Sequence, residues 1–387
     1  MATNNNNKAL NVPPLRFPEF TGEWEYSPLN EYLTENKERN KKGHFITTDV
    51  LSVSGDFGIV NQIQLLGRSF AGKSVLDYHV VRYGNIVYTK SPLKEYPYGI
   101  VKINKGADGI VSTLYAVYNV KSNAYGKFIE SYFALSKRTN KYFKPIVRIG
   151  AKHDMKISNA EAIANIVCFP QYAEQQKIAE FLSLLDERIT TQNKIIEDLK
   201  KLKSAISLKM LHSDSWEQFS IKDIAIIGRG RVISSVEISQ QKNPTYPVYS
   251  SQTSNEGIMG YLDDYMFEGE YISWTTDGAN AGTVFYRNGK FNCTNVCGLL
   301  KLKKGFDTHF VSLVLAEATK KYVSINLANP KLMNNTMGKI QIRLPKLEEQ
   351  KRISLVFRRL HELLATHNSL LTEYSKQKQY LLSQMFI

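Results

Sequence analysis

The sequence predicts an α+β protein in which two mixed α/β domains are separated by two long helices that pack on each other. Three observations lead to this prediction. One stretch of the chain occurs twice, its apolar residues recur with a heptad period, and each copy is preceded by a block rich in short β-type runs. The chain has 387 residues, which is enough for two or three ordinary domains.

The repeated stretch matches position for position without a gap between 170–210 and 345–385. The aligned pairs include Glu174 with Glu349, Gln175 with Gln350, Ile178 with Ile353, Leu185 with Leu360 and Met210 with Met385. An ungapped match of this length indicates a duplicated element.

Each copy predicts one long helix, over 170–212 and 345–387. A proline stands at each start, a glutamate follows in the first turn, and neither copy contains an internal Gly or Pro. The apolar positions step by four and three, which forms a heptad seam. An ordinary amphipathic helix on a domain surface is the alternative. A rise of ~1.5 Å per residue makes each helix longer than a small domain is wide, which favours two helices packed together.

The blocks before the helices repeat more loosely and predict domains over 16–169 and 213–344. Trp24 opens the first block and Trp216 the second, and "RYGNIVYTKSP" corresponds to "FEGEYISWTTD". Likewise "GIVSTLYAVYNV" resembles "KFNCTNVCGLLKL". Both blocks carry short β-type runs between polar loops. The Asn-rich start predicts a disordered tip over 1–15.

The bulk composition narrows the function. A net charge of +14 favours a polyanionic partner, nucleic acid first, although a soluble protein can simply be basic. No apolar run approaches ~18 residues and the start lacks the features of a signal peptide, so we expect a cytoplasmic protein. Three cysteines fit a reducing compartment. Cys293 and Cys297 could share a metal, but structural zinc needs four ligands, and small buried residues are the better interpretation.

The layout, the entry "FPEFTGEW" at 17–24 and the two "P…EQ..I" helix starts resemble the specificity subunit of type I restriction–modification systems. The resemblance implies two target-recognition domains, held apart by the helices as an antiparallel coiled coil. Each domain would read one half of a split, asymmetric site in double-stranded DNA. Two modification (methyltransferase) subunits would bind the helices and carry S-adenosylmethionine, and restriction subunits would cleave. This chain itself would hold no cofactor and perform no catalysis.

Two other classes of function remain open at this point. "GRSFAGKS" at 67–74 fits the P-loop pattern, in which Lys73 would reach phosphates and Ser74 would bind magnesium. Against a nucleotide-dependent enzyme, the chain turns again at Gly84 and no Asp-terminated strand is evident downstream. The second alternative is a stand-alone DNA-binding regulator. No other catalytic motif and no metal-ligand set is evident.

The candidate DNA-reading residues lie in polar loops after predicted strands. In the second block, Gln252 and Asn255 can each bind adenine with two hydrogen bonds, and Asp277 can accept from cytosine. The same two loops, 249–257 and 274–282, also contribute Ser250, Thr253, Thr275, Thr276 and Asn280. In the first block the candidates are Lys90 and Lys94, with Arg68 and Lys73 as weaker ones. Arg229, Arg231, Lys152 and Lys331 are expected to contact phosphates. A solvated turn residue is the alternative for each.

Overall fold

The computed structural model describes residues 11–72, 74–93, 95–149, 155–324 and 329–387. The chain divides into two compact units, which we call unit 1 (Met1–Asn193 with Ser369–Ile387) and unit 2 (Lys194–Asn368). The predicted long helices are confirmed as α4 (Tyr172–Met210) and α9 (Leu347–Gln384). Each unit holds a part of each helix. The sequence-based division, which treats the helices as separate segments and residues 1–15 as a tip, stays a prediction; residues 1–10 lie outside the described ranges.

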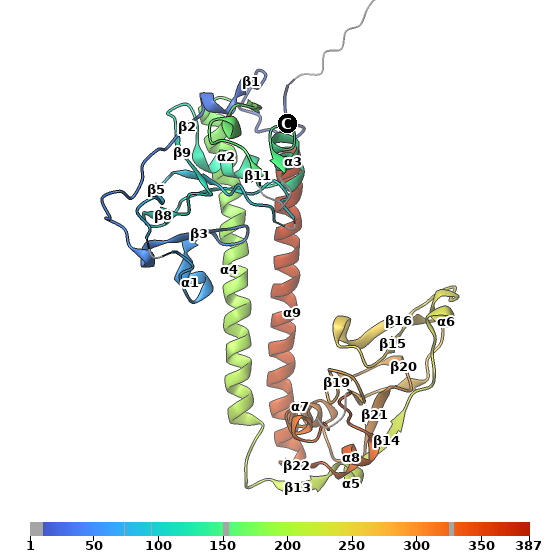
Figure 1. Cartoon of the computed structure of the whole chain (residues 1–387). Helices are drawn as coiled ribbons and strands as arrows, with labels where there is room; N and C mark the ends of the chain where they lie inside the picture. Colours follow the sequence, from blue (N-terminus) through green and yellow to red (C-terminus); the bar gives the residue numbers. More distant parts are fainter. Residues whose placement is uncertain (1–10, 73, 94, 150–154, 325–328) are drawn as a thin grey trace, which may run out of the picture. The chain divides into compact units, whose positions relative to one another are not determined.

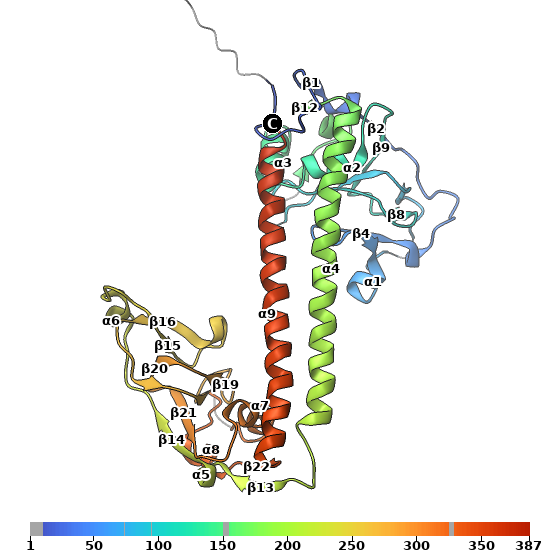
Figure 2. The same ribbon diagram turned by 180° about the vertical axis from the view of Figure 1, so that it is seen from behind.

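In unit 1 the beginning of α4 lies beside the end of α9 (Figures 1 and 2). The Lys378 ammonium donates to the Asp186 carboxylate, and the Arg188 guanidinium lies 5.8 Å from the centre of the Tyr374 ring. Residue numbers rise along one helix while they fall along the other, so the two segments run antiparallel. Apolar side chains at the predicted seam positions enter the core of unit 1, namely those of Ile178, Leu182, Leu185, Leu381 and Met385.

Unit 1 is built around a four-stranded antiparallel sheet with the strand order β2-β9-β6-β7. These strands are β2 (Leu33–Glu35), β9 (Ala116–Val120), β6 (Ile86–Tyr88) and β7 (Val101–Ile103). The antiparallel two-stranded pairs are β1 (Glu25–Pro28) with β12 (Ile166–Phe169), β3 (Leu51–Ser54) with β4 (Gly58–Asn61), β5 (His79–Val81) with β8 (Gly109–Val111), and β10 (Arg148–Ile149) with β11 (Met155–Lys156). The short helices are α1 (Gln62–Leu66), α2 (Gly126–Tyr132) and α3 (Ser136–Phe143), and 3-10 turns span Leu29–Glu31, Thr47–Asp49 and Glu161–Ile163.

Unit 2 contains a sheet of the same kind, with the order β14-β21-β18-β19. Its strands are β14 (Ala225–Arg229), β21 (Cys297–Leu302), β18 (Tyr271–Thr275) and β19 (Val284–Arg287). A second sheet has the order β16-β15-β20-β17, from β16 (Ile258–Leu262), β15 (Tyr246–Tyr249), β20 (Lys290–Cys293) and β17 (Phe267–Glu268), and β13 (Glu217–Ser220) pairs with β22 (Gln341–Leu344). The helices are α5 (Ile221–Ile224), α6 (Ser235–Ser239), α7 (Thr308–Ala318) and α8 (Asn334–Lys339), with 3-10 turns at Ser254–Gly257 and Thr319–Lys321.

The two units repeat one framework, in agreement with the loose sequence repeat. In each four-stranded sheet a large aromatic residue faces a small partner on the neighbouring strand: Tyr88 pairs with Ala116, and Trp274 pairs with Gly298. A Cβ atom on Gly298 would lie 2.2 Å from the Trp274 ring, so the position has no room for a side chain. Both aromatic residues are almost completely buried in the main core of their unit.

The repeated glutamine explains how each long helix is attached to its domain. The Gln175 side chain accepts from the backbone N–H of Tyr125 at 2.9 Å, and its amide donates to the Pro170 carbonyl at 2.9 Å. The Gln350 side chain accepts from the N–H of Asp307 at 2.9 Å and donates to the Pro345 carbonyl at 2.8 Å. Tyr125 and Asp307 are the N-cap residues of α2 and α7. Each buried glutamine therefore ties the start of a long helix to the first turn of a domain helix.

Candidate nucleic-acid interface

Four loops meet at one edge of the main sheet in unit 2. The hydroxyls of Ser251 and Thr276 both donate to the Val296 carbonyl, the second at 2.7 Å. The Gly278 N–H donates to the Pro330 carbonyl at 3.0 Å, and the Leu332 N–H donates to the Thr276 carbonyl at 2.8 Å. These bonds join the loops 250–257, 276–283, 294–296 and 329–333 into one polar surface, which we call the loop cluster. It brings together both of the loops that the sequence predicts to read bases in this half of the chain.

The two predicted phosphate contacts near β14 differ in their surroundings. Arg229 is half-buried in the loop cluster, where its guanidinium donates to the Asn334 side chain at 3.0 Å and to the Asn295 carbonyl at 3.3 Å. Arg231 is exposed and forms an ion pair with Glu237. A carboxylate partner weakens attraction to phosphate, so Arg229 is the stronger candidate of the two.

The predicted base-reading residues separate into exposed and internal groups. Asn255 and Asn280 are exposed, and Asp277 is half-buried with one carboxylate oxygen 3.4 Å from the Ser251 hydroxyl. Thr275 and Thr276 are buried, and their hydroxyls donate to the carbonyls of Asn280 and Val296 respectively. Thr275 and Thr276 therefore have their hydroxyl donors engaged inside the protein.

The remaining candidates of unit 2 lie around the same loops. Gln252 is half-buried and its amide donates to the Ile258 carbonyl, which closes the hairpin between β15 and β16. Ser250 and Thr253 are also half-buried. Lys331 is exposed, and its backbone bridges to Asp277 and to Ser324.

In unit 1, Lys90 lies just after β6 in a polar cluster. Its ammonium donates to the Asn159 side chain at 2.9 Å, and the Asn159 amide donates to the Glu35 carboxylate at 2.9 Å. Burial lowers the pKa of Lys90, while Glu35 opposes that shift. His79 is nearby, and burial, together with Arg39 and Lys90, lowers its pKa to about 4. His79 is therefore neutral, and the cations Arg39 and Lys90 outweigh the Glu35 carboxylate among the charges that act on it, so we call this cluster the positive corner.

The segment 67–74 does not have the setting of a P-loop. Gly67 is the left-handed C-cap of α1, with φ = 76°, so the segment follows a helix. Among the described residues, the next regular element along the chain is the strand β5, whereas a P-loop opens a helix. Arg68 is exposed, and its guanidinium lies 4.6 Å from the centre of the Phe70 ring. Lys73, Lys94 and Lys152 lie outside the described residues.

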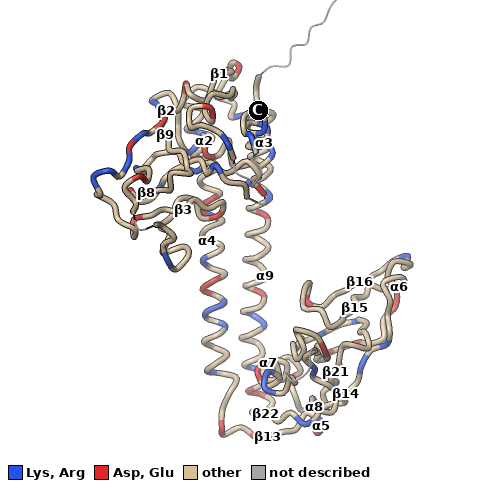
Figure 3. The backbone as a smooth tube through the Cα atoms, viewed as in Figure 1, with Lys and Arg blue, Asp and Glu red and all other residues tan. Residues whose placement is uncertain are grey.

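Several residues at these surfaces lie outside the predicted set. Lys and Arg gather on the loop between β2 and β3, where Lys37, Arg39 and Lys42 are exposed (Figure 3). The run "KERNKK" is a visible signal for this patch. Asn334 and Asn295 bind Arg229 in the loop cluster, and the "NN" at the start of α8 was the available signal for the first of them.

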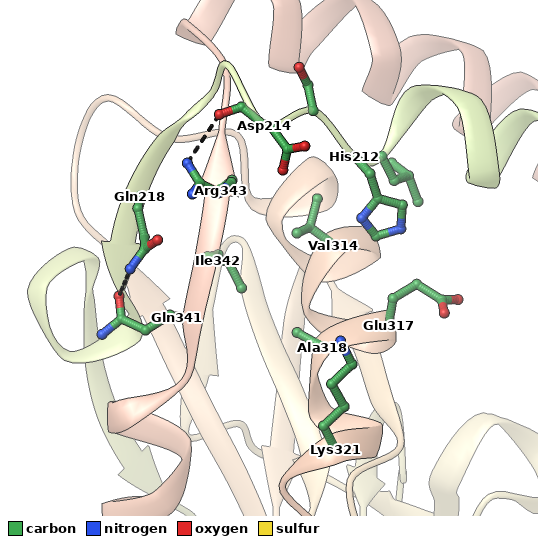
Figure 4. Close-up of a pocket in the computed structure, with 12 residues that line it drawn as sticks. His212, Asp214, Gln218, Val314, Glu317, Ala318, Lys321, Gln341, Ile342 and Arg343 are labelled. Carbon is green, nitrogen blue, oxygen red and sulfur yellow. Dashed lines mark hydrogen bonds between the residues drawn. The ribbon is translucent and has the colours of Figure 1, made fainter.

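A pocket of about 470 Å³ lies in unit 2 beside the link from α4 to β13 (Figure 4). The Arg343 guanidinium donates to the carbonyls of Asp214 and Trp216 at 3.2 and 3.1 Å, which fixes the link. The lining mixes charges of both signs, including Glu317 and Lys321.

Among the described residues, no group of three or more His, Cys, Asp or Glu side chains is arranged to hold a metal, and Cys293 and Cys297 are buried free thiols. No helix in the described part of the chain is long and apolar enough to cross a bilayer.

Comparison with known proteins identifies the family. Residues 213–373 match the model of the type I restriction modification DNA specificity domain. A putative type I specificity subunit of Mycoplasma pneumoniae is 39% identical over 190 residues, which are 48% of this chain and 79% of that relative. The MpnII specificity subunit of the same organism is 45% identical over 141 residues, 36% of this chain and 42% of the relative.

Solved structures share the fold. The S subunit of a type I restriction-modification system from M. genitalium aligns with a TM-score of 0.68 at 15% identity, over 97% of this chain and 99% of that one. A chain from a structural study of complex assembly in the type I R-M system aligns with a TM-score of 0.52 at 14% identity, over 94% and 97% of the two chains. The mixed α/β architecture with two long helices is thus that of known specificity subunits. From the family model and the relative covered over 79% of its length, the chain belongs to the specificity subunits of type I restriction–modification systems.

Proposed function

We propose that this chain selects the DNA sequence for a type I complex by reading a split target, with one half-site assigned to each unit. The observation that carries the proposal is a shared framework with different chemistry at the strand ends. Both units have the same four-strand order and the same glutamine junction. Unit 1 presents Lys90, Asn159 and Glu35 at its corner, whereas unit 2 presents Arg229 and Asn334. Two such surfaces suit two half-sites of different sequence.

In unit 2 we assign base reading to candidate side chains that are exposed or half-buried. The candidates that are assigned to the protein's internal contacts instead support the loops. Asn255, Asn280 and Asp277 have the donors and acceptors that distinguish base edges in the major groove. Arg229 and Lys331 supply charge for phosphates. The remaining candidates act in this proposal as loop supports: Ser250, Gln252, Thr253, Thr275 and Thr276.

In unit 1 the proposed interface consists of the positive corner around Lys90 and the loop between β2 and β3. Lys90 is placed to contact a base edge or phosphate once Asn159 releases it. Arg39 acts electrostatically on Lys90, and Lys37 and Lys42 are exposed on the same loop as Arg39. Arg68, which follows α1, adds a further exposed charge. Affinity from such contacts arises largely from released counterions, so it is expected to fall steeply with salt.

The proposal also includes partners that carry the chemistry. The two long helices expose apolar side chains, including Leu184, Leu202, Leu355 and Leu363. A partner protein that packs along these helices would remove this apolar surface from water, which is favourable. We propose that two modification subunits bind there and supply S-adenosylmethionine, that restriction subunits join the same complex, and that this chain binds DNA without catalysing a reaction.

The test is a methylation map made with this chain and the modification subunits encoded beside it. Replacing residues 216–344 with the equivalent block of a relative should change one half of the methylated sequence and leave the other half as it was. Asn255→Ala should relax the requirement at one base of the half-site assigned to unit 2. Methylation without sequence preference, or a change in both halves after the exchange, would refute the proposal.

A further inference from the structure

Arg287, the last residue of β19, is a buried arginine in unit 2. It is 4% exposed, and among the residues that the structure describes it has no carboxylate within ion-pair distance. Its guanidinium donates to the Ser273 hydroxyl at 2.9 Å and to the Glu256 carbonyl at 2.7 Å. It also lies 3.6 Å from the centre of the Tyr249 ring. Burial lowers the pKa of Arg287, as expected for a charge taken out of water, and the opposing influence of Tyr249 and Glu256 is smaller. A charge in this position is costly, so its contacts need an explanation.

The carbonyl that Arg287 binds belongs to a strained loop. Asn255 and Glu256 have φ values of 47° and 51°, in the left-handed region, which asparagine adopts fairly readily but a residue such as glutamate adopts rarely. Gly257 continues at φ = 84°, so three successive residues are left-handed. Such a conformation persists only where surrounding contacts fix it. Arg287 supplies a charged hydrogen bond at the second of these residues.

Other contacts hold different parts of the same loop. Ser251 donates to Val296 and Gln252 donates to Ile258, and both residues lie in the first limb of the loop. The N–H of Ser250 donates to the Gly257 carbonyl at 2.9 Å and closes its base. Within the described residues, Arg287 is the side chain that binds the backbone of the left-handed limb. Ser254, Asn255 and Glu256 remain exposed at the tip.

We propose that Arg287 is a positioning residue for DNA recognition: it fixes the 250–257 loop from behind, so that Asn255 meets base edges in one orientation. This inference rests on the proposed function of unit 2. An amide side chain distinguishes one base from another only when its two hydrogen bonds have fixed directions. Ordering a mobile loop on binding lowers the affinity for DNA. Arg287 touches no base itself and acts through the loop.

The test replaces Arg287 with methionine in the full chain, assembled with its modification subunits. Methionine has a similar length, and an apolar group in place of a buried unpaired charge is expected to preserve the fold. The ratio of kcat/KM for the target to kcat/KM for single-base variants should fall at least tenfold for the unit 2 half-site. The same ratio for the unit 1 half-site should not change. Hydrogen exchange of residues 250–257 should become faster, whereas the midpoint of thermal unfolding should stay near that of the wild type.

Lys303→Met is the matched control, because Lys303 is an exposed cation of the same unit that donates to the Asp223 carbonyl at 2.7 Å. It should leave discrimination at both half-sites intact. If Arg287→Met fails to fold, the same ratios are measured for Arg287→Lys. Lysine keeps the charge but lacks the planar guanidinium that binds Ser273 and Glu256 at the same time. Full discrimination by a folded Arg287→Met variant, or by Arg287→Lys in its place, would overturn the positioning role. A wild-type complex without any sequence preference would instead overturn the proposed function.

Discussion

Replacing Gln350 with methionine should destabilise unit 2 by about 2–3 kcal/mol. The substitution keeps the length of the side chain and removes both hydrogen bonds of the junction. The Pro345 carbonyl is buried, and a buried backbone group left without a partner costs about 1–3 kcal/mol. The Asp307 N–H is only partly buried, so water can replace its lost acceptor in part and the cost is about 0.5–1 kcal/mol. The better burial of an apolar side chain offsets some of the sum.

Hydrogen exchange followed by mass spectrometry measures this loss within one unit. A loss of about 2–3 kcal/mol corresponds to exchange about 30- to 160-fold faster in the most protected amides of 305–315. Gln218→Met is the control, because Gln218 is an exposed glutamine of the same unit whose amide donates to the Gln341 side chain at the surface. It should cost less than about 0.5 kcal/mol. If the Gln350 variant exchanges no faster than the control, the two hydrogen bonds of Gln350 do not stabilise the junction.

Three further predictions concern pH, nucleotides and salt. Burial keeps His79 neutral with a pKa of about 4, below its ordinary 6.5, so the unfolded chain binds the extra proton between these values. The free energy of unfolding of unit 1 should therefore fall as pH drops from 6.5 to 4, by at most about 1.4 kcal/mol per pH unit for this proton. Urea titrations at several pH values should show a weaker pH dependence of this free energy for His79→Gln than for the wild type. An equal pH dependence in the two proteins would contradict the role of His79. The isolated chain should not bind ATP, since 67–74 follows a helix; a calorimetric signal abolished by Lys73→Ala would reverse this view. DNA binding should weaken steeply with salt, and Arg229→Ala should reduce the slope of log K against log salt by about 1; a slope near zero for the wild type would contradict the phosphate contacts.

The long helices were predictable because their signals are local. The heptad seam and the ungapped match lie within single segments, and α4 and α9 begin close to the prolines that the sequence pointed to. Alignment also paired Gln175 with Gln350. Their hydrogen bonds to Tyr125 and Asp307 were out of reach, because those partners lie 50 and 43 residues away along the chain.

The strand order and the inner side of the loops were not predictable in the same way. β15 pairs with β16 nearby in the chain and also, in parallel, with the distant β20, and no local pattern specifies the second pairing. A polar loop also hides which hydroxyls turn inward. Thr275 and Thr276 read as surface residues, yet their donors are used by carbonyls of neighbouring loops. Arg287 gave no signal at all, since a strand-end arginine is ordinarily a surface residue.

The facing pairs Tyr88–Ala116 and Trp274–Gly298 have a consequence for how such chains diverge. The larger side chain, that of Trp274, lies opposite Gly298, which has no side chain. The smaller one, that of Tyr88, lies opposite the methyl group of Ala116. Space between these two strands is fixed by the backbone spacing, so a gain in volume on one strand has to be matched by a loss on the other. Across related sequences, these two columns should therefore covary in size, and a chain with tryptophan at the first position and alanine at the second should be rare.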